Sequence, residues 1–464
     1  MPDALVPCGH LCGLKAALPA LAGAAYCRTG HPARARSAAF TPQKRGGREE
    51  RWICRTPSFH PHVPPPEGGT PNPDWLRGAG CGDSRRVASG SVVSNTVVSH
   101  DLLTSLLRDV SRSFYLTLRV LPAAIRSQIG LAYLLARTTD TIADTEIVPV
   151  NERLAALAAL RERILGKTSA PLDFRRFALP AAPNDNNHAA AASAAERVLL
   201  LRVEEALAVL ADCGAADRRR INDVLDVITG GQEMDLRRFA SAGEHTSDAL
   251  PTPTDQERGR PARECQRTII ALQTAADLDD YTYRVAGCVG EFWTKMCRAH
   301  LFPDVRLDEA QLLANGIRFG KGLQLVNILR DLPKDLRTGR CYLPAPELAA
   351  CDLTPADLLD PAHEPRLRPV YDRWLDRAEQ HLAAGWEYTN TLPRSQIRLR
   401  LACAWPVLIG LQTLRRLRTS RVLDPAARIK ITRAEVRGII VKTVLRLPSD
   451  AAWRRLAEPL PPVL

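Results

Sequence analysis

Apolar residues recur every three or four positions through most of the chain after residue 98. Between Leu102 and Val110, for example, the apolar side chains fall on one face of a helix. The same spacing predicts further helices over residues 129–143, 151–165, 194–210, 218–239, 271–300, 308–332, 369–392 and 397–417. Few segments alternate with a period of two, so we expect no substantial sheet. The pattern predicts an all-α fold, a bundle of about ten or more helices.

Two polar stretches interrupt this helical pattern. Residues 168–193 hold three prolines and a run of asparagines and alanines, and residues 241–263 hold three prolines among polar residues. Proline and short polar side chains favour turns over helix. Both stretches are therefore predicted to be long loops, of the kind that form insertions or mobile flaps.

The first 98 residues differ in composition from the rest. They are rich in proline, glycine, alanine and arginine and show no sustained periodicity. Such a segment cannot bury enough apolar surface to offset the entropy of ordering it. We expect residues 1–98 to be disordered, either as a transit-like leader or as the product of a start site placed too far upstream. Residues 99–448 would form one folded domain, and residues 449–464 a C-terminal tail.

The net charge of +12 is unevenly distributed. Residues 1–98 contain twelve Lys or Arg and six Asp or Glu, so half of the excess lies there. The remainder is spread thinly over the helical part. A diffuse basic balance suits anionic substrates or a membrane surface. Nucleic acid is not an expected partner, because the chain has no zinc-finger spacing, basic zipper or aromatic RNA-binding signature.

The twelve cysteines are scattered, and most lie in apolar, helix-like sequence. A reduced thiol there acts as a small core residue, which predicts a cytoplasmic protein. No apolar run reaches the roughly 18–20 residues that span a bilayer; the best candidates are residues 16–26 and 404–411. We therefore expect no transmembrane anchor and, at most, peripheral association with the inner face of the membrane.

Two pairs of aspartates carry the first chemical signal. Asp140 and Asp144 are four residues apart, and Asp331 and Asp335 repeat that spacing nearly two hundred residues later. On a helix each pair shares one face, where like charges cost roughly 0.2–0.5 kcal/mol. Magnesium is bound through one or two carboxylates together with substrate phosphate oxygens. Two acidic faces across a cavity would therefore hold a diphosphate between them.

A single acidic pair is more often a solvated helix face than a metal site. Here both pairs lie in largely apolar helices, and each has an arginine nearby, Arg137 or Arg330. Arginine donates paired hydrogen bonds to phosphate oxygens. The combination favours a binding site over a solvated surface.

Five segments occur in the order seen in squalene and phytoene synthases, and the chain resembles that family. They are residues 111–114, 137–144, 281–290, 327–335 and 339–344. Residues 231–236 also resemble the family's Gly-x-x-x-Asp-Leu helix. The resemblance covers about residues 100–420 and implies a single-domain helical bundle of the isoprenoid synthase type, with a central cavity for diphosphate and magnesium. Residues 99–448 would then be its catalytic domain.

The resemblance implies a head-to-head condensation of two prenyl diphosphates. The leading interpretation is squalene formation from farnesyl diphosphate through presqualene diphosphate, with reduction by NADPH. The alternative is a phytoene or dehydrosqualene synthase, which uses no reductant. A third interpretation, a non-catalytic assembly factor, fits less well because all four aspartates are present. A monomer is expected.

The resemblance also assigns roles to individual residues. Magnesium, or manganese, would be held by Asp140, Asp144, Asn327, Asp331 and Asp335. The catalytic residues would be Arg137, Asp140, Asp331 and the proton-removing or cation-stabilising Tyr281. The substrate would meet Arg112, Ser113, Phe114, Gln324, Asn327 and Arg330. No pattern marks a nicotinamide site, so the residues that would bind NADPH stay unassigned.

Some residues fit a structural role as well as a functional one. Gly287 and Gly290 more often allow close helix packing than ligand contact, and Asp235 fits pairing within the bundle. Pro333, between the second pair of aspartates, predicts that the helix ends there.

The segment before Cys403 departs from the pattern of animal and fungal squalene synthases. Those enzymes carry a phenylalanine where this chain has Ala402, and that phenylalanine is associated with the reductive step. Trp405, one helical turn further on, would have to shelter the cation in its place. The departure weakens the squalene interpretation more than the family resemblance.

Overall fold

The computed structural model describes residues 101–458, except 112–113, 181–191, 241–267, 425 and 428. All described residues belong to one compact unit. Three expectations lie partly or wholly outside them: the disorder of residues 1–98, the loop at 241–263 and most of the loop at 168–193. Where residues 168–180 are described, a short 3-10 helix, η3 (Arg175–Ala178), follows an irregular stretch.

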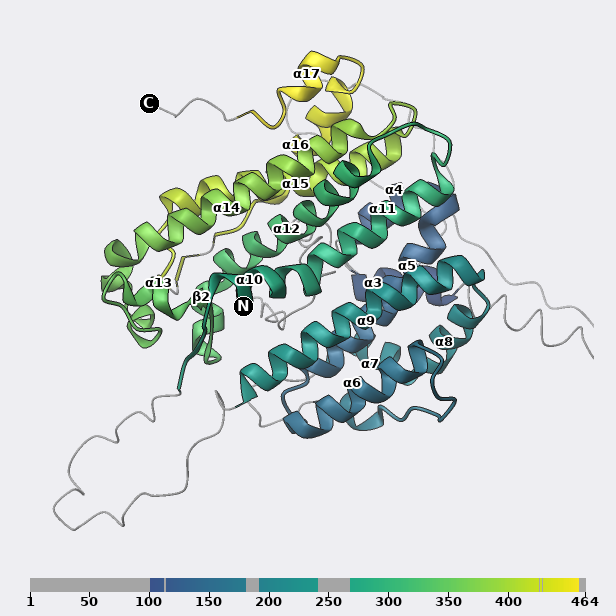
Figure 1. Ribbon diagram of the computed structural model, residues 1–464, viewed down its shortest axis with the longest axis horizontal. Helices are drawn as coiled ribbons and strands as arrows, with labels where there is room; N and C mark the ends of the chain where they lie inside the picture. Colours follow the sequence, from purple (N-terminus) through teal and green to yellow (C-terminus); the bar gives the residue numbers. More distant parts are fainter. Residues whose placement is uncertain are drawn as a thin grey trace, which may run out of the picture. The chain divides into compact units, whose positions relative to one another are not determined.

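The described part is mostly helical, which confirms the predicted all-α class (Figure 1). Its first half contains η2 (Leu102–Leu106), α3 (Leu107–Ser111), α4 (Phe114–Val120), α5 (Ala123–Asp144), α6 (Val150–Ile164), α7 (Ala194–Leu201), α8 (Val203–Ala211) and α9 (Ala215–Arg238). Its second half contains α10 (Ala275–Thr282), η7 (Tyr283–Gly287), α11 (Cys288–His300), α12 (Glu309–Arg337), α13 (Ala345–Ala349), α14 (Glu364–Thr391), α15 (Ile397–Thr419), α16 (Arg433–Arg446) and α17 (Asp450–Arg454). Between α13 and α14 lie the 3-10 turns η8 (Ala356–Leu359) and η9 (Pro361–His363).

Two of the helices predicted as continuous are interrupted in the structure. The one over residues 194–210 is divided at Arg202 into α7 and α8, and the one over 271–300 begins as a strand. That strand, β1 (Ile270–Leu272), pairs in parallel with β2 (Arg340–Pro344) and brings Ala271 opposite Cys341. Strands of three and five residues are too short to show a period of two, so the sequence pattern missed this small sheet.

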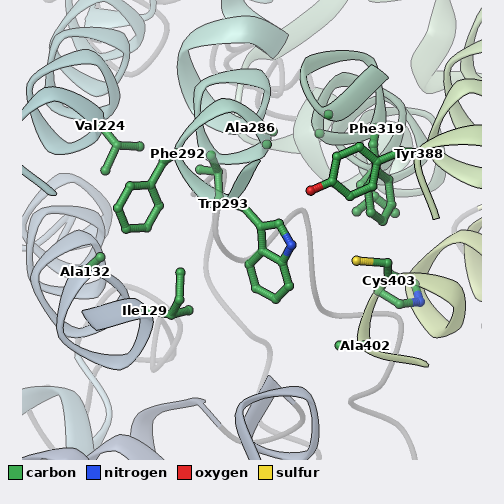
Figure 2. A pocket seen from close by; sticks show the side chains of 16 residues that line it. Ile129, Ala132, Val224, Ala286, Phe292, Trp293, Phe319, Tyr388, Ala402 and Cys403 are labelled. Carbon is green, nitrogen blue, oxygen red and sulfur yellow. The ribbon is translucent and has the colours of Figure 1, made fainter. Parts of the chain in front are cut away.

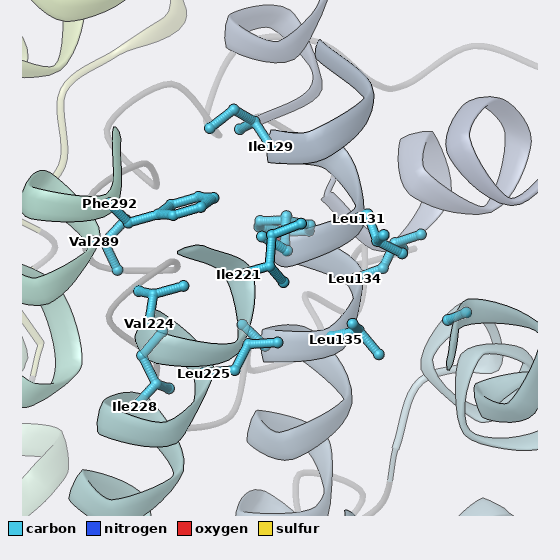
Figure 3. Packing of buried hydrophobic residues seen from close by; sticks show 14 of the residues in the cluster. Ile129, Leu131, Leu134, Leu135, Ile221, Val224, Leu225, Ile228, Val289 and Phe292 are labelled. Carbon is cyan, nitrogen blue, oxygen red and sulfur yellow. The ribbon is translucent and has the colours of Figure 1, made fainter. Parts of the chain in front are cut away.

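Three helices interlock around one apolar core (Figure 3). Leu131 and Leu135 of α5, Ile221 and Leu225 of α9, and Phe292 of α11 all belong to this core. Leu135, Ile221 and Leu225 are almost completely buried. Their three-and-four spacing is the pattern that predicted these helices, and it fixes which faces of α5 and α9 look toward each other.

Glycines let α12 cross the η7–α11 segment at short range. A Cβ at Gly290 would lie 1.9 Å from the Gly316 carbonyl oxygen, and one at Gly320 would lie 2.1 Å from the Ala286 carbonyl oxygen. Real side chains do not fit at such separations, so the helices meet backbone to backbone. The predicted packing role of Gly290 is confirmed. On its other side α12 runs against α14, with α15 beside both (Figure 1).

The prediction that α12 ends at Pro333 is wrong. The helix continues to Arg337, so Asp331 and Asp335 share one helix. Proline removes the backbone hydrogen bond to the carbonyl four residues earlier. That carbonyl belongs to Leu329, and it accepts a hydrogen bond from the Tyr371 hydroxyl at 2.9 Å instead. The side chain on α14 therefore replaces the bond that the proline cannot make.

Two features of the C-terminal part bear on the expectations from sequence. By length and composition α15 could cross a membrane, but 83% of its apolar window is buried inside the unit, as in the core helix of a soluble protein. The search for long apolar runs overlooked it because charges interrupt its two ends. Within the range expected to be a tail, α17 packs on the unit, with Trp453 fully buried and stacked on Trp386.

Candidate active site

An apolar cavity lies between the long helices (Figure 2). About 700 Å³ in and around it is not filled by atoms, and this space includes open solvent at its mouth. The lining comes from every long helix around it and is almost wholly apolar: Ile129, Ala132, Val224, Ala286, Val289, Gly290, Phe292, Trp293, Gly316, Phe319, Gly320, Leu323, Tyr388, Ala402, Cys403 and Pro406. Such a cavity suits a hydrocarbon chain and excludes water.

A second, polar cavity lies where these helices end. Its lining includes Asp144 at the C-terminus of α5, Gln232 and Asp235 on α9, Tyr281 on α10 and Arg340 at the start of β2. At 1.5 Å per residue, Ala132 and Asp144 are about 18 Å apart along α5. Helices α5 and α9 therefore line the apolar cavity with one part of their length and carry acids further along. A substrate with a charged head and a long apolar tail requires this arrangement.

Arg340 lines the polar cavity. Its Nη1 donates to Asp235 at 3.3 Å, and the side chain is almost completely buried. Burial opposes its charge, but Tyr342, Asp235 and Asp144 together hold its pKa above the usual range. Burial raises the pKa of Asp335 well above its usual value, and the charge of Arg340 opposes that rise. One guanidinium is thus coupled to acids on α5, α9 and α12.

Asp235 is fully buried beside this arginine. Burial raises its pKa to about 6, while Arg340 and the Tyr342 hydroxyl oppose that rise. The Tyr342 hydroxyl donates to the Asp235 carboxylate at 3.2 Å. The role expected for Asp235, pairing within the bundle, is observed, but its partners line or border the cavity. Asp235 therefore belongs to the site.

Tyr281 is buried at the inner wall of the polar cavity. Its ring stacks on Tyr342 with centroids 4.9 Å apart. Burial, followed by Tyr342 and Asp235, raises its pKa well above the usual value. The phenol is therefore neutral at any physiological pH. It would act as a hydrogen-bonding group or a polarisable ring face and not as a phenolate base.

The second acidic pair is divided between a buried and an open position. Asp335 is almost completely buried, and burial followed by the charge of Asp331 raises its pKa well above the usual value. Asp331 is part-exposed and accepts two hydrogen bonds from Arg330, at 2.8 and 2.6 Å. Asn327, one turn earlier on α12, is partly buried. The structure thus places Asp335 inside, facing the charge of Arg340, and Asp331 outside.

The first acidic pair is divided in the same way. Asp140 is completely buried, and its Oδ2 accepts a hydrogen bond from Arg137 at 2.8 Å. Arg137 also pairs with Glu196, which caps the start of α7. Asp144 is less buried and lines the polar cavity. Of this pair, Asp144 is the carboxylate that lines the polar cavity.

Several predicted site residues lie elsewhere. Arg112 and Ser113 fall outside the described residues, as does the side chain of Phe114. Gln324 is buried on α12 and lines neither of the two cavities described above. Trp405 does not shelter the apolar cavity: its indole Nε1 donates to Thr443 of α16 at 3.0 Å, on the far side of α15, whereas Ala402 lines the cavity.

Sequence reasoning missed two residues that line the polar cavity, Arg340 and Gln232, and Tyr342, which is bonded to Asp235 beside it. The signal was available, because Arg340 and Tyr342 stand in the recognised segment 339–344 and Gln232 stands in 231–236. No pattern in those segments says that they meet. The β1–β2 pair and the end of α9 bring them together.

The donors at the site fit magnesium completed by a substrate. Within the described ranges, no three His, Cys, Asp or Glu side chains converge closely enough to hold a metal ion by themselves. The carboxylates that face the cavity are hard oxygen donors, and the buried Asp335 has a like charge beside it that a cation would relieve. Magnesium commonly takes one or two carboxylates and completes its shell with phosphate oxygens and water. Asp144 lines the polar cavity, and the charge of Asp335 is coupled to Arg340 in the same cavity. These two carboxylates and Asp331 are the candidates to hold the ion.

Comparison with known proteins identifies the family of the chain. The family model described as squalene/phytoene synthase matches residues 107–435. A bifunctional lycopene cyclase/phytoene synthase of Gibberella fujikuroi is 37% identical over 108 residues, which cover 23% of this chain and 19% of that protein. A 15-cis-phytoene synthase of Enterobacter agglomerans is 33% identical over 145 residues, covering 31% and 44%. The matched region is thus less than half the length of either relative.

The fold is also that of a solved structure. The complex of TcSQS with the ligand BPH1237 aligns with a TM-score of 0.57 and 21% identity, covering 78% of this chain and 95% of that one. At this identity the likeness shows the fold, which is of the isoprenoid synthase type, as the sequence predicted.

Proposed function

Since the chain belongs to the squalene/phytoene synthase family of prenyltransferases, we propose that it joins two prenyl diphosphates head to head and releases a phytoene-type product without a reductant. The observation that carries the condensation is the position of Arg340. Its charge interacts with Asp144 on α5, Asp235 on α9 and Asp335 on α12. The apolar cavity lies further along the same helices. The diphosphates bind among these charges, and the prenyl chains extend into the cavity.

The ionisation step follows from the charges at the site. Magnesium, the usual cofactor of the family, would be held by Asp144, Asp331 and Asp335 and would neutralise charge developing on the diphosphate. Arg340 adds a fixed, buried positive charge on the same side. Preorganised charges of this kind stabilise a departing anion without reorganising. The carbon–oxygen bond of the first substrate breaks, and the allylic cation is left on the apolar side.

The cation then needs a dry environment and a proton acceptor. The almost wholly apolar lining excludes water that would quench it. The double bond of the second substrate attacks the cation, and loss of a proton closes a cyclopropane ring. Tyr281 is neutral and stacked on Tyr342, which is bonded to Asp235. The buried carboxylate of Asp235, which lines the polar cavity and has a pKa of about 6, would accept the proton.

The absence of a reductant is the second half of the proposal. The curated relatives carry phytoene synthase activity in their names, which favours the alternative interpretation over squalene formation. On α15, Ala402 lines the cavity and Trp405 points toward α16, so that helix supplies no aromatic ring for a reductive second step. The rearranged cation would instead lose a proton.

Product analysis tests the proposal. Purified protein is incubated with magnesium and either geranylgeranyl or farnesyl diphosphate, with and without NADPH. We expect phytoene or dehydrosqualene in equal amounts with and without NADPH. Squalene formed only when NADPH is present would overturn the proposed product and leave the condensation in place. A lack of any head-to-head product, while the helical circular dichroism is intact, would overturn both.

A further inference from the structure

The outer face of α16 combines apolar and basic side chains. Val441, Val444 and Leu445 are 54%, 50% and 73% exposed. Their three-and-four spacing places them on one side of the helix. Arg437, Lys442 and Arg446 are exposed on the same helix, within one turn of these residues. We define these six residues as the α16 face.

The opposite side of α16 is fixed to the bundle. Val436 is buried, and Thr443 is buried and accepts a hydrogen bond from the Trp405 indole at 3.0 Å. A capping box between Thr432 and Glu435 starts the helix. Figure 1 shows α16 beside α15, the helix that it contacts. The exposed side chains are therefore presented on a rigid support and are not the result of a loosely attached helix.

The charge of the α16 face has one sign. Glu435 is the only acid within α16, and it is engaged with Arg416 and with its own cap. The face thus has three positive charges around three apolar side chains and no negative charge. Lysine and arginine stems lie along apolar surface while their charged ends reach outward. This combination binds the boundary between lipid headgroups and acyl chains when those headgroups are anionic.

We infer that the α16 face docks the protein on the surface of an anionic bilayer. Two other occupants fit the charge less well. A second copy of the chain related by a two-fold axis would place like charges against each other. The chain's own residues 1–98 have twelve Lys or Arg against six Asp or Glu, so they too would be repelled. A bilayer supplies both the negative charge and the apolar layer that the six side chains require.

Vesicle binding tests this inference on the full-length protein. Vesicles contain phosphatidylcholine alone or phosphatidylcholine with phosphatidylglycerol. We expect binding to the anionic vesicles that weakens as salt is raised. The double variant Val441→Ser/Leu445→Ser should bind at least about tenfold more weakly. The triple variant Arg437→Gln/Lys442→Gln/Arg446→Gln should lose the preference for anionic vesicles.

A matched control lies on α7. Val198 and Leu201 are 43% and 59% exposed on that helix, and Val198→Ser/Leu201→Ser removes the same kind of apolar area. This control should bind vesicles as the wild type does. Equal loss in both double variants, or no loss in the α16 variants, would overturn the inference.

Two further measurements distinguish docking on a bilayer from dimerisation and from damage to the active site. If light scattering shows a dimer that the α16 double variant breaks, and vesicle binding is unchanged, the occupant is a second copy and the inference is overturned. Synthase activity with detergent-dispersed substrate should be the same in wild type and α16 variants, because no α16 residue lines either cavity of the site. Vesicle binding is measured without substrate, so its result is independent of the proposed function.

Discussion

The Tyr371 hydroxyl on α14 donates a hydrogen bond to the Leu329 carbonyl on α12 at 2.9 Å. Leu329 is four residues before Pro333, so this carbonyl has no backbone N–H to accept from. Tyr371 is completely buried, so the bond is shielded from solvent. Because the bond keeps α12 helical through the proline, Asp335 stays on the same helix as Asp331 and is directed inward.

We expect Tyr371→Phe to destabilise the protein by about 1–3 kcal/mol, because it leaves the Leu329 carbonyl buried without a donor. It should also lower turnover, since Asp335 depends on the helical path beyond Pro333. In a Pro333→Ala background the restored N–H at position 333 can bond Leu329. Tyr371→Phe should then cost less, with a coupling of about 0.5 kcal/mol or more in denaturant unfolding. Additive effects of the two substitutions would show that tyrosine and proline are unrelated.

The two aspartates on α5 should respond differently to the same substitution. Asp144→Asn changes a carboxylate that lines the polar cavity, so we expect turnover to fall by roughly a hundredfold or more while the melting temperature is preserved. Asp140→Asn instead removes a buried partner of Arg137. It should lower the free energy of unfolding by about 1–3 kcal/mol, although Glu196 still pairs with the arginine. Circular dichroism melts and product assays on both variants check this. Equal melting temperatures would contradict the division of roles.

The helical framework could be predicted from sequence because long helices bury one continuous stripe. Residues 129–143 and 218–239 show that stripe, and they lie within α5 and α9. The two aspartate pairs were also found, because their spacing repeats. Which member of the first pair lines the cavity was not predictable, since Asp140 and Asp144 share a helix face by sequence. Only the positions of Arg137, Glu196 and Arg340 separate them.

The remaining errors came from contacts between distant segments. Arg340 reaches Asp235 across more than a hundred residues, and the short β1–β2 pair that positions it has no periodic signature. The helix through Pro333 depends on a hydroxyl from α14. The local sequence around Pro333 predicts a helix end, but the tertiary hydrogen bond from Tyr371 allows the helix to continue.

Trp293 is expected to limit the length of the prenyl chain. It extends from α11 into the middle of the apolar cavity, between Phe292 and Cys403 (Figure 2). Trp293 follows Tyr281 by twelve residues of helix, which at 1.5 Å per residue is about 18 Å. Trp293→Ala should raise the ratio of kcat/KM for geranylgeranyl over farnesyl diphosphate by about tenfold or more.

The same substitution elsewhere provides the control for Trp293. Trp374 is part-buried on α14 and donates its indole N–H to Glu347, away from the cavity. Trp374→Ala should leave the ratio of the two substrates unchanged. A shift of equal size in both variants would mean that loosened packing, and not the length of the cavity, sets the preference.

His381 should make the protein less stable in mild acid. It is buried on α14, and burial followed by the charges of Arg377, Arg318 and Lys321 lowers its pKa from 6.5 to about 4, against the smaller opposite effect of Asp279. The folded state therefore favours the neutral ring. Its contribution to stability is complete above pH 6.5 and is lost as the pH falls toward 4. By linkage the loss of stability between pH 8 and pH 5 is about 2 kcal/mol.

Denaturant unfolding of wild type and His381→Gln across this pH range measures that loss. The variant cannot titrate there, so its free energy of unfolding should fall less between pH 8 and pH 5 than that of the wild type. Parallel pH profiles for the two proteins would mean that His381 is not held neutral by the fold.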